Sequence, residues 1–158
     1  YVHSIFDELG FDAITLNPYL GYTALLPFLE RKEKGCIILC RTSNVGADEF
    51  QNLIVEDRPL WQYVAERVSK HWNQYHNCML VVGATQPSVL KQVRHIVGDM
   101  PILVPGIGAQ GGDLAAVLLN GLDSQKRGII INASRSIIFS ENPAHQAQVL
   151  QQQINAYR

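Results

Sequence analysis

Five short apolar segments, separated by longer amphipathic ones, constrain the fold of this chain more than any other feature. Each segment is a continuous run rich in isoleucine, valine and leucine, in which polar and apolar residues do not alternate. Continuous runs of this length are typical of strands that are buried on both faces, as in parallel sheets. The five predicted strands are residues 12–17, 36–41, 78–83, 101–105 and 128–132.

The segments between the predicted strands have the period of amphipathic helices. In the longest of them, Leu60, Val64, Val68 and Trp72 recur at every fourth position, and Pro59 suits a first helical turn. The predicted helices are residues 2–9, 22–31, 59–76, 86–97, 112–120 and 142–157. This alternation of strand and helix predicts an α/β fold with right-handed crossovers between parallel strands.

The spacing of the predicted strands distinguishes two α/β architectures, an open doubly wound sheet and a (β/α)8 TIM barrel. The strands begin at residues 12, 36, 78, 101 and 128, so one βα unit averages 29 residues. Eight such units need about 232 residues, close to the length of about 250 that is typical of the barrel. We therefore expect residues 1–158 to form the last five βα units of a single barrel domain, with about three units before Tyr1.

The composition excludes several classes of function. The net charge is −1 and only 17% of the residues are charged, which gives no electrostatic basis for binding nucleic acid or an anionic membrane. No apolar run approaches the roughly 18 residues that span a bilayer, and the first residues do not resemble a signal peptide. The cysteines, Cys36, Cys40 and Cys78, include no CxxC pair. They predict reduced thiols in a cytoplasmic protein, with no disulfide framework and no metal site.

The segment from Val104 to Asp113, VPGIGAQGGD, predicts an anion-binding loop. It follows a predicted strand and precedes a helix, and its glycines let an anion approach backbone N–H groups. Arg135 follows the last predicted strand, so it is expected at the same edge as Gln110, where a guanidinium can bind two phosphate oxygens. A glycine-rich turn can also be purely steric, and Arg135 can form a surface ion pair. A dinucleotide site fits poorly, because Asp123 precedes its strand.

Several loops together resemble one enzyme family. VPGIGAQGGD and the later NASRSIIFSENP are similar to the last two βα loops of orotidine 5′-phosphate decarboxylases. RTSNVGA at 41–47, followed by Phe50 and Gln51, also resembles that family. LNPYLG at 16–21 and VVGATQP at 81–87 resemble one bacterial branch of it. The similar segments are spread over five loops and cover essentially the whole chain. The resemblance implies a TIM barrel that decarboxylates orotidine 5′-monophosphate to UMP in pyrimidine biosynthesis.

The resemblance also has implications for cofactors, oligomeric state and domain organisation. Decarboxylases of this family use no cofactor and no metal. They are homodimers, in which one catalytic aspartate comes from the neighbouring subunit. Such a decarboxylase is either a separate enzyme or part of a bifunctional UMP synthase.

The resemblance assigns six residues to substrate contacts. Those that hold the 5′-phosphate are Gln110, Gly111, Ser134 and Arg135. Those that contact the pyrimidine are Ser43, through its side chain and backbone, and Pro105, which packs on the base. Without the resemblance, Ser43 is more typical of a loop cap and Pro105 of a strand end.

The chain departs from the family at the decarboxylation centre. In the family a D-x-K-x-x-D motif on an earlier strand places a carboxylate opposite the substrate's carboxylate, and a lysine protonates the carbanion that remains. Residues 1–158 contain no D-x-K, and no lysine lies at the carboxyl end of a predicted strand. We therefore expect the motif upstream of residue 1. We assign no catalytic residue within the chain and expect the chain alone to be inactive.

Two other functions remain open from the sequence. One is a non-catalytic module that binds a phosphoribosyl ligand, and the other is a different phosphate-binding barrel lyase with no preference for pyrimidine. Among the remaining residues, Cys36 and Cys40 lie four apart on one predicted strand, so we expect them in the core. Asn17 follows a strand and is expected near the rim of the active site.

Overall fold

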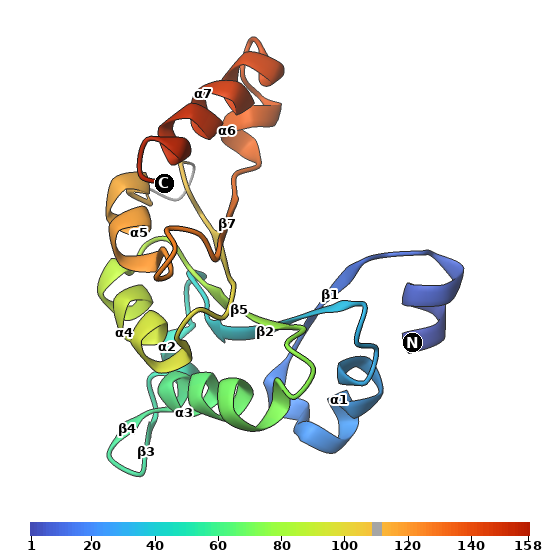
Figure 1. The fold of residues 1–158 in the computed structure, drawn as a ribbon. Coiled ribbons are helices and arrows are strands. Elements are labelled where there is room, and N and C mark those ends of the chain that lie inside the picture. Colours follow the sequence, from blue (N-terminus) through green and yellow to red (C-terminus); the bar gives the residue numbers. More distant parts are fainter. Residues whose placement is uncertain (109–111) are drawn as a thin grey trace.

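A computed structural model describes residues 1–108 and 112–158 of the chain. At its centre is a five-stranded parallel sheet, with helices along its outer side (Figure 1). The strands are β1 (Ala13–Leu16), β2 (Gly35–Arg41), β5 (Cys78–Val82), β6 (Ile102–Pro105) and β7 (Ile129–Asn132). They are ordered β1-β2-β5-β6-β7, so each strand of this sheet after β1 pairs with the one before it. A doubly wound sheet reverses its strand order at a switch point, so this order supports the barrel.

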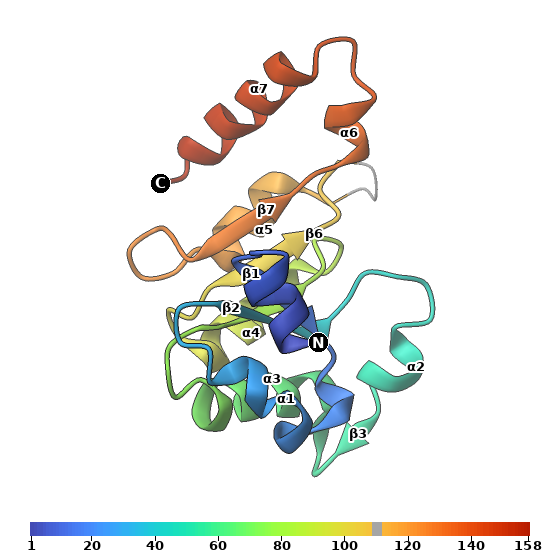
Figure 2. The same ribbon diagram turned by 90° about the vertical axis from the view of Figure 1, so that its right-hand side faces the viewer.

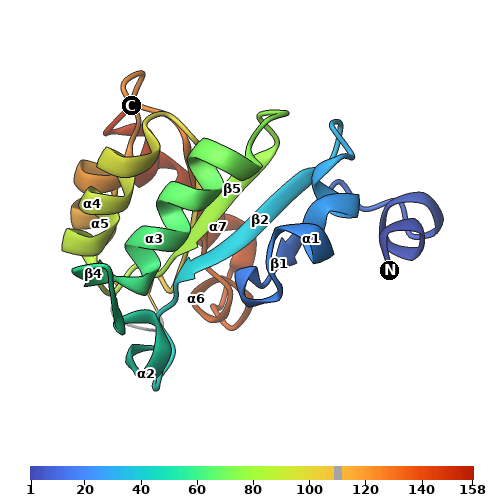
Figure 3. The ribbon, with the colours of Figure 1, turned by 90° about the horizontal axis from the view of Figure 1, so that it is seen from below.

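The helices between successive strands form an arc along the outer side of the sheet (Figures 1 and 3). They are α1 (Tyr22–Leu29), α3 (Leu60–Arg67), α4 (Pro87–Val97) and α5 (Leu114–Gly121). A π-helical turn, η3 (Val68–Trp72), continues α3. Helix α4 begins with a proline at its first position. Helix α5 begins after Asp113, whose side chain accepts a hydrogen bond from the backbone N–H of Ala116.

The hydrophobic core lies between the sheet and these helices. Alternate residues of the strands face the helices, and side chains with no exposed surface on this face include Cys36, Ile38, Leu80, Ile102 and Val104. The helices contribute fully buried side chains that include Leu90, Val93 and Val117. The prediction that Cys36 and Cys40 lie in the core is confirmed, since they are 0% and 3% exposed.

The opposite face of the sheet carries a second set of apolar side chains. Strand register places Val81 beside Leu103, and Leu103 beside Ile130. Leu103 is half-buried and Ile130, on the edge strand β7, is 46% exposed. In a TIM barrel this face becomes the interior, which side chains from all eight strands fill.

The remaining elements lie at the two ends of the chain. Near the N-terminus are a π-helical turn, η1 (Ser4–Glu8), and a short 3-10 helix, η2 (Pro18–Leu20). After β7 come the short α6 (Arg135–Ile138) and α7 (Pro143–Asn155), which extend beyond the β7 edge (Figure 2). None of the helices in the described ranges is long and apolar enough to cross a membrane.

The segment between β2 and α3 is more ordered than the long loop that the sequence predicts. It contains α2 (Asp48–Gln51) and a hairpin of β3 (Ile54–Val55) and β4 (Arg58–Pro59). The two residues of the hairpin turn, Glu56 and Asp57, have φ values of 49° and 65°, as a tight two-residue turn requires. The predicted helix over 59–76 ends earlier, at Trp72, with the π-helical turn.

Candidate functional site

The predicted substrate contacts that the structure describes lie where β2, β6 and β7 end. Because the strands are parallel, their carboxyl ends meet at one edge of the sheet. Ser43 follows β2, Pro105 ends β6, and Ser134 and Arg135 follow β7. Gln110 and Gly111, the other two predicted contacts, lie outside the described residues.

The loops after β2 and β5 are packed against each other. The backbone N–H of Gly83 donates to the carbonyl of Arg41 at 2.8 Å. A Cβ atom on Gly83 would lie 2.6 Å from Cβ of Ser43 and 2.9 Å from its backbone nitrogen. Only a residue without a side chain fits at this distance, so Gly83 sets how closely β5 approaches the Ser43 loop.

The loops after β5, β6 and β7 also lie close to one another. The backbone N–H of Ala84 donates to the carbonyl of Pro105 at 2.9 Å. Gly108, with φ of 79°, lies so close to α6 that a Cβ there would be 3.1 Å from Oγ of Ser136. The loops after β2, β5, β6 and β7 therefore form one continuous row, which joins the predicted pyrimidine contacts to the predicted phosphate contacts.

Arg135 begins α6 and its side chain is exposed. Over the two described ranges, 1–108 and 112–158, no carboxylate lies within ion-pair distance of its guanidinium. Ser134, also exposed, donates its hydroxyl hydrogen to Oδ1 of Asn132 at 3.3 Å. The end of β7 thus presents a guanidinium without a carboxylate partner next to a hydroxyl group, a combination that suits an anion.

Arg41, the last residue of β2, is a buried charged side chain whose role was not predicted from the sequence. It is 2% exposed, and its guanidinium donates to the carbonyl of Thr42 and to the carboxylate of Asp48. The contacts connect the strand end to α2. The sequence could have indicated this residue, because Arg41 is the one charged residue at the end of an otherwise apolar predicted strand.

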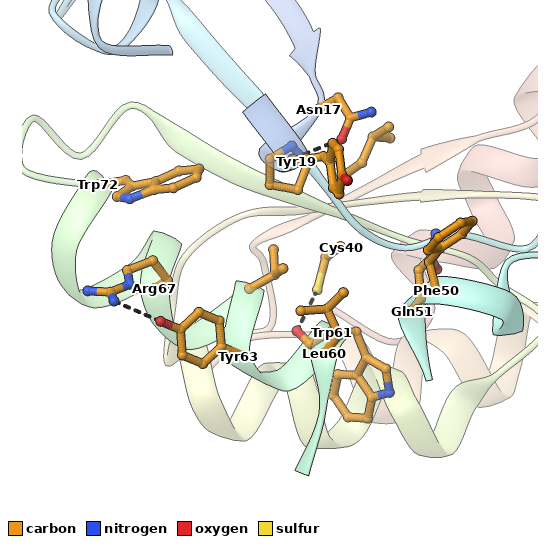
Figure 4. Close-up of a pocket in the computed structure, with 13 residues that line it drawn as sticks. Asn17, Tyr19, Cys40, Phe50, Gln51, Leu60, Trp61, Tyr63, Arg67 and Trp72 are labelled. Atoms are coloured by element: carbon orange, nitrogen blue, oxygen red, sulfur yellow. Dashed lines mark hydrogen bonds between the residues drawn. The ribbon is translucent and has the colours of Figure 1, made fainter. Parts of the chain in front are cut away.

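A cavity of about 570 Å³ lies on the outer side of β2, beside this row of loops (Figure 4). Its lining is mainly apolar and aromatic, and includes Cys40, Phe50, Trp61 and Trp72. Asn17, predicted near the active-site rim, lines this cavity, where its Oδ1 accepts from the backbone N–H of Tyr19 at 3.1 Å. The lining contains none of the predicted substrate contacts that the structure describes.

The cysteines are packing residues. All of them are buried and unpaired. Removal of water by burial raises the pKa of the Cys36 thiol to about 11, and raises the pKa of Cys40 and Cys78 to about 12. Within the described part of the chain, no group of three or more His, Cys, Asp or Glu residues could hold a metal ion.

Comparison with known proteins identifies the family. Residues 1–150 match the family described as orotidine 5′-phosphate decarboxylase / HUMPS family. The chain belongs to this family. It is 47% identical over 152 residues to an orotidine 5′-phosphate decarboxylase of Janthinobacterium sp. (strain Marseille), covering 96% of this chain and 56% of that protein. It is 46% identical to one from Cellvibrio japonicus, covering all of this chain and 60% of that protein.

Solved decarboxylases have the same fold as this member of the family. The Leishmania donovani OMP decarboxylase superposes with a TM-score of 0.95 at 41% identity, covering 99% of this chain and 61% of that one. The Leishmania donovani UMP synthase superposes with a TM-score of 0.97 at 44% identity, covering all of this chain and 35% of that one. The chain thus spans little more than half the length of its curated decarboxylase relatives, and its fold is five consecutive βα units of a TIM barrel.

Proposed function

We propose that this chain forms the phosphate- and pyrimidine-binding part of an enzyme that decarboxylates orotidine 5′-monophosphate to UMP. Membership of the family supports the reaction class. The structural observation that carries the proposal is the row of loops at the carboxyl edge. In it, Gly83 packs against Ser43, and Gly108 packs against the helix that begins with Arg135.

The two ends of this row suit the two ends of a nucleotide. At the end of β7, Arg135 and the backbone N–H of Ser134 bind the 5′-phosphate, together with Gln110 and Gly111 of the glycine-rich loop. Nearer the centre of the sheet, Pro105 packs on the base and Ser43 hydrogen-bonds to its edge. The phosphate contacts lie away from the reacting carbon, so they supply binding energy that is used in the transition state.

The bond-breaking chemistry is assigned to residues outside this chain. The bond between the pyrimidine ring and its carboxylate breaks, CO₂ leaves, and the electron pair stays on the ring carbon. A lysine ammonium then donates the proton that completes UMP. Residues 1–158 contain no D-x-K-x-x-D motif. We propose that this lysine and its neighbouring aspartates precede residue 1, and that one aspartate comes from the second subunit of a homodimer.

The proposed enzyme uses no cofactor and no metal. We place it in the cytoplasm, because the cysteines of the chain are unpaired, as is usual in a reducing compartment.

Isothermal titration calorimetry with UMP tests the binding role. We expect UMP to bind and the substitution Arg135→Gln to weaken binding by about tenfold or more, because a charge-assisted contact to phosphate is lost. The matched control is Arg127→Gln, which removes an exposed arginine at the opposite edge of the sheet. Failure of the unsubstituted chain to bind UMP would contradict the proposal.

Two further measurements separate the alternative functions. Equal affinity for UMP and for ribose 5-phosphate would favour a phosphate-binding barrel that does not recognise pyrimidine. An assay of CO₂ release from orotidine 5′-monophosphate is expected to show no turnover by residues 1–158 alone. Turnover by these residues would overturn the assignment of the catalytic lysine to another segment.

A further inference from the structure

Thr42, which precedes the proposed pyrimidine contact Ser43, has a partner for each of its hydrogen-bonding groups. Its backbone N–H donates to Oε1 of Gln51 at 2.9 Å, and Nε2 of Gln51 donates to its Oγ1 at 2.9 Å. The Thr42 hydroxyl donates to Oδ1 of Asn44 at 2.6 Å. Its carbonyl accepts from Nη1 of Arg41 at 2.6 Å. The position of the backbone entering Ser43 is therefore fixed from several directions.

The Gln51 side-chain amide makes a two-point contact with Thr42. Its oxygen accepts from the backbone and its nitrogen donates to the hydroxyl, so exchanging the two ends would pair donor with donor at the backbone. Nη1 of Arg41 lies 3.4 Å from the same Oε1 and fixes the orientation further. The amide faces Thr42, while the side chain also lines the apolar cavity (Figure 4).

Arg41 holds the four-residue helix α2 against the end of β2. A cation that is 2% exposed must be compensated by hydrogen bonds or an opposite charge. The compensation comes from Asp48, at the start of α2, and from the Thr42 carbonyl. Asp48 also accepts from Nδ2 of Asn52 at 2.8 Å. These contacts hold α2 in place, and with it Gln51.

We infer that Gln51, held in place by Arg41, is a positioning residue that orients the Thr42–Ser43 segment for recognition of the pyrimidine ring. The inference rests on the proposed function, in which Ser43 contacts the base. Gln51 acts through Thr42 and makes no substrate contact of its own. It determines specificity for the base and has no role in binding the phosphate, which lies at the end of β7.

The substitution Gln51→Leu tests this role, because leucine is of similar size and lacks the amide. We expect the affinity for UMP to fall about tenfold, since two hydrogen bonds that fix Thr42 are lost, while the affinity for ribose 5-phosphate changes less than about twofold. The matched control is Gln62→Leu on α3. Its amide donates to Oε1 of Gln92 at 2.9 Å, outside the site, and both affinities should stay unchanged.

A second variant and a second readout keep the test independent of stability. Gln51→Glu retains an acceptor for the Thr42 N–H and loses only the donor to its hydroxyl, so UMP affinity should fall less than with leucine. Amide hydrogen exchange at Thr42 should become about tenfold faster in Gln51→Leu, because this N–H loses its acceptor, and should stay slow in Gln51→Glu.

Each result has a distinct meaning. If the unsubstituted chain does not bind UMP, the proposed function fails and this inference fails with it. If the chain binds UMP and Gln51→Leu binds it equally well, the positioning role is wrong and the proposed function stands. An equal loss of affinity for UMP and ribose 5-phosphate in Gln51→Leu would show a general structural effect, and would also overturn the positioning role.

Discussion

At the scale of single residues, Gly83 and Gln51 act together to determine where Ser43 lies. Because Gly83 has no side chain, the Ser43 backbone can lie directly against the end of β5. Gln51 holds the preceding residue, Thr42, from α2. The position of Ser43 therefore depends on the missing side chain of Gly83 and on the Gln51 amide, which acts through Thr42.

Replacing Gly83 with alanine should move Ser43. The added Cβ would lie 2.6 Å from Cβ of Ser43, so one of the two loops must shift. We expect a loss of about 1–3 kcal/mol in the free energy of unfolding, measured in urea, and a weaker affinity for UMP. Gly98→Ala is the control, because its φ of 59° strains the backbone while its Cβ meets nothing within 4 Å. It should lower stability without changing UMP affinity, and an unchanged UMP affinity in Gly83→Ala would contradict the prediction.

The buried cysteines predict low thiol reactivity in the folded protein. Burial raises the pKa of Cys40 to about 12, so the reactive thiolate is scarce at about pH 8. Iodoacetamide should label no cysteine of the native chain at that pH, and should label all of them in urea, as measured by mass spectrometry. Rapid labelling of the native chain would contradict the burial.

The same burial makes stability depend on pH. Unfolded cysteines ionise at about pH 8.5. Because the thiols bind their protons more tightly in the folded state, they stabilise the fold. This stabilisation is complete below the unfolded pKa and is lost as the pH rises toward the folded pKa values.

The spacing of residues predicted roles only where a role depends on neighbouring positions along the chain, and the roles of the substrate contacts came from the family resemblance. The core positions of Cys36 and Cys40 follow from their spacing on one strand, and the structure confirms them. The role of Gly83 depends on Ser43, forty residues away, and nothing in the local sequence encodes that contact. The contact between Gln51 and Thr42 likewise depends on a helix that has no periodic signal.

At the scale of elements, long periodic segments were predictable and short ones were not. The predicted strands correspond to the observed parallel strands within one or two residues, because each is a continuous apolar run. The four-residue α2 and the two-residue strands of the hairpin are too short to show a period. The long predicted helix ends early, at Trp72, and Oδ1 of Asn73 then accepts from the N–H of Cys78 at the start of β5.

Arg94 connects α4 to the segments beside the amino ends of β6 and β7. Its guanidinium donates to the carbonyls of Gly98, Met100, Gly121 and Gly128 at 2.6–2.8 Å. Arg94→Met should lower the free energy of unfolding by about 2–4 kcal/mol in urea denaturation, because partly buried carbonyls lose their donors. Lys91→Met, at an exposed position of the same helix, should change stability by less than about 0.5 kcal/mol. Equal effects of the two substitutions would contradict this role for Arg94.

At the scale of the whole molecule, the sheet is open at both edges. In residues 1–108 and 112–158, strands β1 and β7 each have one neighbour, and the apolar face that becomes a barrel interior is uncovered beside Ile130. The barrel was predictable from the average length of a βα unit, and the strand order supports it independently. Five parallel strands do not close a barrel, so this face stays open in residues 1–158.

Residues 1–158 alone should self-associate through this open face. Sedimentation velocity should give a mass above the 17.6 kDa of the monomer, because unpaired strand edges and exposed apolar side chains attract one another. Ile130→Lys places a charge on the open face and should shift the distribution toward monomer. Leu119→Lys replaces a residue that is 74% exposed on α5, on the helical side, and should leave the distribution unchanged. A monodisperse monomer before substitution would contradict the prediction.

The strand order also suggests how the chain acquires its structure during synthesis. Strands β2, β5, β6 and β7 each pair with the strand of the main sheet made just before them, so each finds a partner that the ribosome has already added. Within residues 1–158 the sheet can grow one strand at a time from β1 to β7. Arg135 follows the last strand, so it joins the row of loops only after every other contact of that row has been synthesised. The proposed phosphate site can therefore form only after β7 has been added to the sheet.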